Sequence, residues 1–224
     1  MKTREYTLHD DILKEYGIAS INNAQQLLDD ARILLINKSF ARAYFLAVAA
    51  IEETGKAYIA HAARGRNLSD DGLVKKIQDM FENHSSKISS AFACWISNAS
   101  KQEESSKAAV DLIINLKNGR ESSMYVDVNS DNSLSIPSKI VSPSAAVGSI
   151  NVAKNCLYHT ISRISGSHVS LYSSFEDKLF CLNSNKIKEI FSNDDFGEYI
   201  LSELNKTLGH FNLPRTIVTY HDKY

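Results

Sequence analysis

The sequence has few of the residues that interrupt helices. It contains only three prolines and nine glycines in 224 residues. All-β sandwiches, barrels and linker-rich chains depend on both residue types for their turns, so this composition disfavours those classes. Long stretches rich in alanine, leucine and isoleucine lie between these interruptions, and they favour helices.

Reactive cysteine patterns, excess charge of one sign and long apolar runs are also lacking. Cys94, Cys156 and Cys181 are far apart without metal or redox spacing, which predicts buried thiols in a reducing compartment. Lys and Arg number 25 against 26 for Asp and Glu, which excludes nucleic-acid binding by bulk charge. The longest apolar run, Ala43 to Ile51, has nine residues, whereas a bilayer span needs roughly 20. The charged start, MKTREYTLHDD, is unlike a signal peptide, so we expect a cytoplasmic protein without membrane contact.

Apolar residues recur at helical spacing along most of the chain. The pattern predicts helices at about residues 18–37, 39–64, 69–98, 103–117 and from 143 towards 168, with shorter ones at 185–191 and 194–208. It is lost between Gly119 and Ser142, where MYVDV indicates a short extended segment. We therefore predict an all-α bundle with a long irregular loop and extra C-terminal helices. Residues 1–224 are expected to form a single domain, with a core at about 15–172 and a helical extension over 173–224.

The predicted helix at 39–64 carries charge where its apolar pattern predicts burial. It is apolar on nearly every face, yet its middle reads Glu52-Glu53-Thr54-Gly55-Lys56. Buried charges are costly unless they are paired and hydrogen-bonded. One interpretation is a structural Glu52–Lys56 ion pair with a close helix crossing at Gly55, and the other is a functional site.

Two more polar features lie near predicted core positions. His84 falls on the apolar stripe of the 69–98 helix, with Lys87 one turn further on. A lone histidine on such a face is more often a satisfied core residue than a catalyst. Arg120, Tyr125 and Asp127 place a cation, a phenol and a carboxylate at the start of the irregular segment, which taken alone is a turn leading into a strand.

Together these segments resemble the AbiV family of abortive infection proteins, within the HEPN superfamily. The resemblance covers roughly residues 15–165 and rests on four elements in order: Asn23–Ala31, Ala50–Lys56, Asn83–Lys87 and Arg120–Asp127. It implies a HEPN-like helical bundle, a homodimer, and a bacterial antiphage protein that halts growth of the infected cell. It implies no cofactor and no metal.

Many HEPN relatives are metal-independent RNases with an Arg-x(4–6)-His motif. There the histidine serves as general base or acid at the ribose 2′-hydroxyl, and the arginine holds the phosphate. Three pairs match this loose pattern: Arg4/His9, Arg163/His168 and Arg215/His221. Only Arg163/His168 is expected on a late bundle helix, where HEPN enzymes carry their motif.

A second candidate site is the polar cluster that the AbiV-like segments would assemble. Its members are Glu52, Glu53, Lys56, His84, Lys87, Arg120, Tyr125 and Asp127. In that site Lys56 and His84 would face one pocket, His84 would transfer protons, and Lys56, Lys87 and Arg120 would bind phosphate. The alternative is a polar network that only sets helix register and holds the loop.

Two functions follow from these observations. The first is an antiphage effector that cleaves RNA without metal or attacks the translation machinery, with RNA, the ribosome or a phage-encoded activator as partners. The second is a non-catalytic helical protein that blocks translation by binding a phage or ribosomal partner. The near-neutral charge favours the second, whereas the buried-looking Glu, Lys and His set favours the first.

Overall fold

Helices make up nearly all of the regular structure in the described part of the chain, which confirms the predicted all-α class. The structure is a computed structural model that describes residues 7–97, 112–113, 115–116, 118–166, 168–206 and 211–223. The chain divides into two compact units. The first contains the residues up to Arg64 together with Ile77–Val169, and the second contains Gly65–Lys76 together with the residues from Ser170 onwards.

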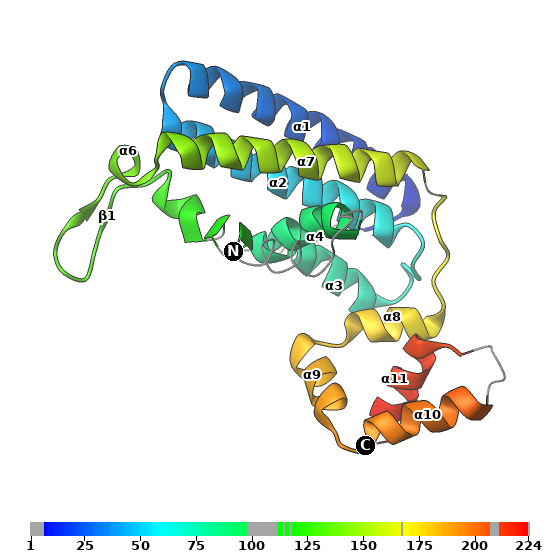
Figure 1. Ribbon diagram of the computed structural model, residues 1–224. Helices are drawn as coiled ribbons and strands as arrows, with labels where there is room; N and C mark the ends of the chain where they lie inside the picture. Colours follow the sequence, from blue (N-terminus) through cyan, green and yellow to red (C-terminus); the bar gives the residue numbers. More distant parts are fainter. Residues whose placement is uncertain are drawn as a thin grey trace. The chain divides into compact units, whose positions relative to one another are not determined.

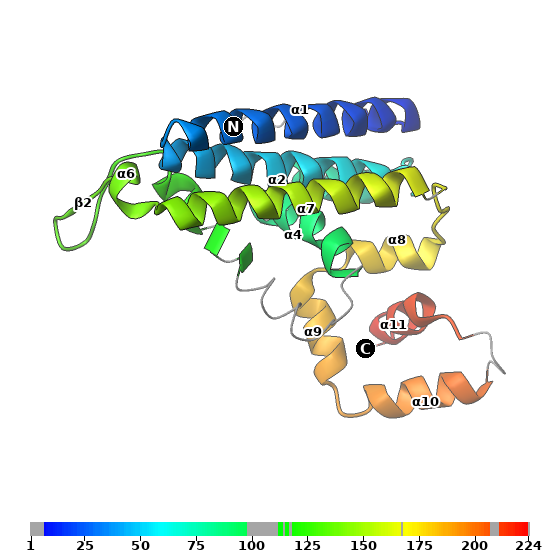
Figure 2. The same cartoon turned by 45° about the horizontal axis from the view of Figure 1, so that its top comes forward.

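Helix α2 (Phe40–Ala63) is the central element of the first unit. It forms an antiparallel hairpin with α1 (Asp10–Ile36), and α7 (Pro143–Gly166) runs beside both (Figures 1 and 2). Helix α4 (His84–Ser97) packs against α2 as well. The connection between α1 and α2 is as short as predicted, and Lys38 within it has a positive φ of 59°.

The apolar stripes predicted from the sequence form the core of this unit. Buried residues lie on nearly every face of α2, as its uninterrupted apolar pattern requires. They pack with the buried stripes of its neighbours, which include Ala24, Leu28, Ala31, Ile88, Ala146, Ile150, Ala153 and Leu157. Helix α1 begins earlier than expected because His9 caps it, its Nδ1 accepting a hydrogen bond from the Ile12 amide at 3.3 Å.

The single helix predicted at 69–98 is wrong, because the chain forms two helices there. Helix α3 (Asp71–Glu82) ends just before Asn83, and α4 begins directly after it. The Asn83 side chain accepts a hydrogen bond from the Ser86 amide at 2.9 Å and so caps the new helix. The predicted start near residue 69 is close to the observed one, where Asp70 accepts a hydrogen bond from the Leu73 amide at 3.0 Å.

The break at Asn83 changes which side chains are buried. A continuous helix would place His84 on the apolar stripe, but as the first residue of α4 it is exposed. Lys87 is buried instead, and so is Ile88 next to it. The helix that restarts after the cap therefore buries the side chain of Lys87 against α2, while the His84 side chain stays about half exposed.

A small hairpin projects from the first unit within the segment predicted to be irregular (Figure 1). Strands β1 (Asp127–Val128) and β2 (Leu134–Ser135) pair antiparallel, with Asp127 opposite Ser135 and Val128 opposite Leu134. The short helix α6 (Pro137–Ile140) follows. The helix predicted at 103–117 lies mostly outside the described residues, although residues 112–113 and 115–116 are helical.

The second unit is a small helical cluster. It contains α8 (Ser174–Cys181), α9 (Ser184–Ser192), α10 (Phe196–Lys206) and α11 (Leu213–His221). Its apolar centre is formed by Ile190, Phe196, Ile217 and Tyr220. The sequence predicted α9 and α10 but missed α8 and α11. The Ser173–Glu176 capping box was the available signal for α8. The end of the helix predicted at 194–208 lies outside the described residues.

A buried ion pair joins the two sequence segments of this unit. Arg66 donates to Asp177 at 2.8 Å, and its guanidinium lies 4.1 Å from the ring centroid of Tyr172 and 3.9 Å from that of Phe180. This contact spans more than a hundred residues, so no local pattern indicates it.

The expected single domain stays a prediction. The expectation of three buried thiols is wrong for Cys181, which is exposed at the last position of α8.

Candidate functional site

The carboxylate of Glu52 is the centre of the candidate site. Its side chain lies on α2 and is 7% exposed. Oε2 contacts Nδ1 of His84 at 2.7 Å and Nζ of Lys87 at 3.0 Å, and Oε1 lies 2.8 Å from Nε of Arg120. We call Glu52, His84, Lys87 and Arg120 the Glu52 cluster. These residues are far apart in sequence, and the structure brings all four together as the sequence predicted.

Two glycines permit the close approach of the segments that carry the cluster. A Cβ on Gly55 would lie 1.8 Å from the Lys87 carbonyl oxygen, so only glycine lets α4 pack this closely on α2. A Cβ on Gly119 would lie 2.6 Å from the hydroxyl of Tyr44, which is also on α2. The helical residues 118–122 thereby bring Arg120 within reach of Glu52.

Glu52 is an ionised acceptor in spite of its burial. Burial alone would raise the pKa of Glu52, but the hydrogen bonds and charges of His84 and Lys87 outweigh it and lower that pKa. An ionised carboxylate only accepts hydrogen bonds, so Nδ1 of His84 must carry the shared proton. This tautomer leaves Nε2 of the half-exposed ring as the nitrogen that accepts a proton.

Arg120 contacts Glu52 as an ion pair without an aligned hydrogen bond. Its Nε faces Glu52 and its Nη1 pairs with Glu121. Nε of Arg120 and Oε1 of Glu52 are buried, yet neither has an aligned hydrogen-bond partner among the described residues. The guanidinium also lies 5.4 Å from the ring centroid of Phe45. These ion pairs use Nε and Nη1 of Arg120, so its Nη2 is the candidate to contact a phosphate.

Lys56 has a different carboxylate partner from the one proposed for a structural ion pair. Its Nζ donates to Glu53 at 2.5 Å, at spacing i,i+3, and not to Glu52. Burial alone would lower the pKa of Lys56, but Glu53 together with Tyr16 and Glu52 keeps that pKa above its ordinary value. Lys56 therefore stays charged, and it lines a pocket with Lys87. His84 is not among the residues that line this pocket, contrary to prediction.

The prediction that Tyr125 and Asp127 join the site is wrong. Both are exposed on the hairpin segment, and an Asp127 carboxylate oxygen accepts a hydrogen bond from the neighbouring Val128 amide at 2.8 Å. They follow Arg120 closely in sequence. However, the chain leaves its helix after residue 122 and turns outward into the hairpin, which carries them away from Glu52.

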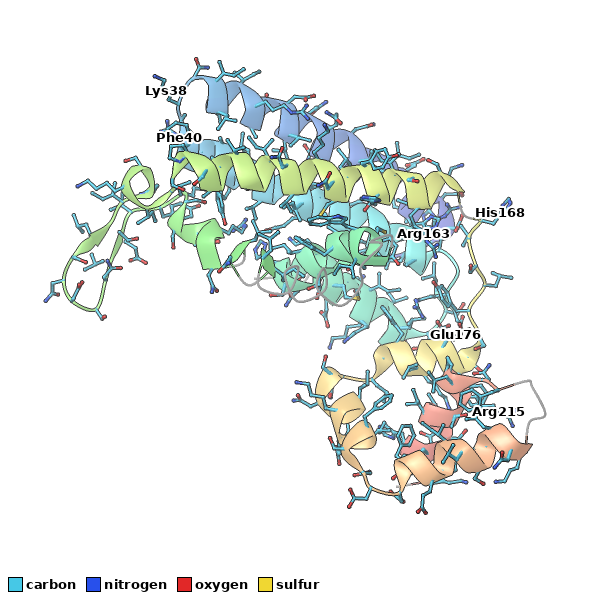
Figure 3. The ribbon with its side chains drawn as sticks, in the orientation of Figure 1. Lys38, Phe40, Arg163, His168, Glu176 and Arg215 are labelled. Carbon is cyan, nitrogen blue, oxygen red and sulfur yellow. The ribbon has the colours of Figure 1, made fainter. Side chains whose placement is uncertain are left out.

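The predicted pair Arg163 and His168 does not lie on one helix. Figure 3 shows both near the C-terminal end of α7, but α7 stops at Gly166, and the exposed His168 follows it. Glycine is a poor helix former and ends the helix there.

Burial lowers the pKa of His61 on α2, and the charges of Arg64 and Arg163 lower it further. The sequence analysis missed this proximity of His61 to Arg163.

The described residues offer little for metal or thiol chemistry. No group of three or more His, Cys, Asp or Glu side chains among them is arranged to hold a metal ion. Burial and the nearby Cys94 raise the pKa of Cys156 to about 12, and burial also raises the pKa of Cys94. Thiols with raised pKa values are poor nucleophiles at neutral pH.

Among the described residues, no helix is both long and apolar enough to cross a bilayer.

A family model described as AbiV matches residues 12–158, more than half of the sequence. The chain belongs to the AbiV family. Membership of AbiV, within the HEPN superfamily, associates it with abortive infection, a defence role of the HEPN type. No curated protein and no solved structure matches the sequence.

The AbiV match bears differently on the two candidate sites. Its range contains all four residues of the Glu52 cluster and ends before Arg163 and His168. The Glu52 cluster therefore lies within the matched range, whereas the Arg163/His168 pair lies outside it. Among the residues that sequence reasoning missed are Tyr16, beside Lys56, and Phe45, beside Arg120.

Proposed function

We propose that this AbiV-family protein halts growth of the phage-infected cell by cleaving RNA without a metal ion, with His84 as the proton-transfer group. It would act in the cytoplasm, where its RNA and ribosome targets are found. The observation that carries the proposal is the Glu52–His84 contact of 2.7 Å, in which a buried carboxylate holds a ring that is 53% exposed. A histidine oriented through one nitrogen and open at the other is suited to general base catalysis.

The proposed chemistry needs only groups of the Glu52 cluster and a water molecule. Nε2 of His84 takes the proton of a ribose 2′-hydroxyl, and the 2′-oxygen attacks the adjacent phosphorus. The bond to the 5′-oxygen breaks, and that oxygen takes a proton from water. The hydroxide that remains takes the proton from His84, so the products are a 2′,3′-cyclic phosphate and a 5′-hydroxyl, and His84 is neutral again. The positive charge that forms on His84 is stabilised by Glu52, and Arg120 would hold the phosphate through Nη2.

We further propose that the active form is a homodimer and that a phage-encoded protein activates it. The resemblance to HEPN relatives supports the dimer, and a growth-arresting activity needs a trigger that is absent from the uninfected cell. The test of RNA cleavage therefore includes an extract of infected cells alongside the purified protein.

We expect the wild-type protein to cleave total or ribosomal RNA in the presence of EDTA, and His84→Ala to reduce the rate by about 100- to 10,000-fold, the usual contribution of a general base. His168→Ala is the matched variant, because it removes an exposed histidine outside the cluster and should retain cleavage. Gel analysis of end-labelled RNA measures the rates, and circular dichroism checks that both variants fold.

Three results would contradict parts of this proposal. Loss of cleavage in His168→Ala alone would move catalysis to the end of α7. Cleavage that disappears with EDTA would overturn the metal-independent mechanism. Absence of cleavage with and without the infected-cell extract would overturn RNA cleavage itself.

The hairpin favours a second function, namely arrest by binding a phage or ribosomal partner without catalysis. An isolated two-stranded hairpin is marginally stable in water, and clustered exposed apolar side chains mark interaction surfaces. The hairpin and its flanks expose six large apolar residues: Met124, Tyr125, Val126, Val128, Leu134 and Ile140.

We expect the double variant Val126→Ser, Val128→Ser to fold with a free energy of unfolding within about 0.5 kcal/mol of wild type, because these side chains are 62% and 64% exposed. Chemical denaturation measures this. Growth arrest in infected cells then separates the two functions. Under RNA cleavage the His84→Ala variant loses arrest, whereas under binding alone it keeps arrest and the hairpin variant loses it.

A further inference from the structure

A pocket of about 430 Å³ lies at the base of the hairpin, and no residue of the Glu52 cluster lines it. Val126 directly precedes β1 and Ile136 directly follows β2, and both line this pocket. Its opposite wall comes from the α1–α2 connection and the first turn of α2, where Figure 3 labels Lys38 and Phe40. We call it the hairpin pocket. It is continuous with the strands of the hairpin.

The charge around the hairpin pocket is of one sign. Lys38 and Arg42 line it, both are exposed, and no carboxylate is among its lining residues. In the described part of the chain neither cation has a carboxylate partner, whereas Lys56 and Lys87 are both paired with glutamates. The hairpin pocket therefore complements a negatively charged ligand.

The hairpin offers unpaired main-chain groups next to this charge. Its sheet has two strands, so β1 and β2 each have one edge that pairs with no other strand among the described residues. Such an edge accepts an extended peptide as a further strand, which binds through main-chain hydrogen bonds. The side chains of an added strand would pack beside Val126 and Val128, which are 62% and 64% exposed.

A peptide matches this surface better than a nucleic acid does. Phe40, Met124 and Pro137 join Val126 and Ile136 as apolar lining residues, so apolar side chains find a wall beside the two cations. Nucleic-acid binding depends on many contacts between phosphates and Lys or Arg, and the pocket supplies only two such residues.

We propose that the hairpin and its pocket dock an extended acidic segment of another protein. The segment adds a strand to a free edge of the hairpin, lays apolar side chains against Val126 and Ile136, and brings a carboxylate to Lys38 and Arg42. This gives the chemistry of the partner in the second function proposed above. Only the link from docking to growth arrest rests on that function, and docking itself is independent of RNA cleavage.

The test uses fluorescence anisotropy of the full-length protein with labelled short peptides in which valine and threonine alternate. The peptides end in a pair of glutamates, glutamines or lysines, each with a free or an amidated C-terminus. We expect the glutamate peptide to bind at least about tenfold more tightly than the lysine peptide. Proline in place of alternate valines should abolish binding, because proline donates no hydrogen bond to a neighbouring strand.

Substitutions at the hairpin pocket should weaken binding of the glutamate peptide in steps. Lys38→Gln and Arg42→Gln each remove one exposed cation, so each should cost about two- to fivefold in affinity, and the double variant about tenfold. Lys154→Gln changes an exposed lysine of α7 outside the pocket and should bind as wild type does. Thermal unfolding of each variant confirms that it is folded, as expected for exposed side chains.

The outcomes separate the possible ligands and the two proposals. Equal binding of glutamate, glutamine and lysine peptides, failure of all of them to bind, or unchanged affinity in the double variant would overturn peptide docking. If only a 2′-O-methyl oligoribonucleotide binds and the double variant loses it, the surface belongs to RNA and the proposal also fails. Glutamate binding that survives amidation assigns the carboxylate to a side chain, and binding lost on amidation assigns it to a C-terminus. A double variant that loses the peptide yet still arrests infected cells would contradict arrest by partner binding and support docking.

Discussion

Replacing Glu52 with alanine is expected to lower the free energy of unfolding by about 3–5 kcal/mol, the usual cost of removing one partner of a buried ion pair. The carboxylate faces Lys87 at 3.0 Å and Arg120 at 2.8 Å, and the Lys87 side chain is only 7% exposed. Without Glu52 the buried ammonium group of Lys87 would lose the carboxylate with which it pairs. Helix α4 and the helical residues 118–122 would then lose the ion pairs through which Lys87 and Arg120 contact α2.

Urea denaturation of Glu52→Ala and Glu121→Ala measures this cost against a matched control. Glu121 is also a partner of Arg120, but its side chain is 65% exposed. Exposed ion pairs contribute little, so Glu121→Ala should change the free energy of unfolding by no more than about 1 kcal/mol. Equal losses in the two variants would show that burial of the Glu52 contacts does not stabilise the fold.

The contribution of Glu52 should also depend on pH in a defined direction. The pKa of Glu52 in the folded protein lies below its ordinary value, in spite of burial, because His84 and Lys87 favour the charged form. A carboxylate of this kind stabilises the fold above its unfolded pKa, and the contribution is lost as pH falls through the folded pKa. The difference in stability between wild type and Glu52→Ala should therefore be largest near about pH 7 and shrink towards about pH 3.

The sequence was sufficient to single out Glu52 because the conflict that marks it is local. A helix that is apolar on nearly every face has no solvent side for Glu52, so a charged or polar partner was required. The resemblance to AbiV then grouped Glu52 with the segments that carry His84, Lys87 and Arg120. The helical stripes of α1, α2 and α7 follow from the same periodicity. His84, Lys87 and Arg120 were expected in one polar cluster with Glu52, and all three contact it. The partner expected for Glu52 in a structural ion pair was Lys56, which pairs with Glu53 instead.

Other features of the site depend on events that periodicity does not encode. The cap at Asn83 restarts the helix and so buries Lys87 in place of His84. The same limit applies to Tyr125 and Asp127, which were grouped with Arg120 by closeness in sequence although the chain turns outward between them. The pairing of Arg66 with Asp177 joins distant segments and has no local signature.

Gly55→Ala is the second substitution expected to have a large effect, lowering the free energy of unfolding by about 3 kcal/mol, at the upper end of what overpacking costs. Ordinarily this change favours a helix by about 1 kcal/mol. Here the new Cβ would lie 1.8 Å from the carbonyl oxygen of Lys87 and 2.5 Å from its carbonyl carbon. Both atoms belong to the backbone of α4, so no side-chain rotation relieves the clash and α4 has to move away from α2.

Gly148→Ala is the matched control, because it makes the same change at an exposed position of α7. A Cβ at Gly148 would meet nothing within 4 Å, so the ordinary helix preference should apply and raise stability by about 0.5–1 kcal/mol. The two substitutions thus differ in sign, which thermal or urea denaturation shows directly. Movement of α4 would also carry Lys87 and His84 away from Glu52, so Gly55→Ala should lose RNA cleavage even at temperatures where it stays folded. A stable Gly55→Ala variant with wild-type cleavage would mean that close packing of α4 on α2 does not hold the Glu52 cluster together.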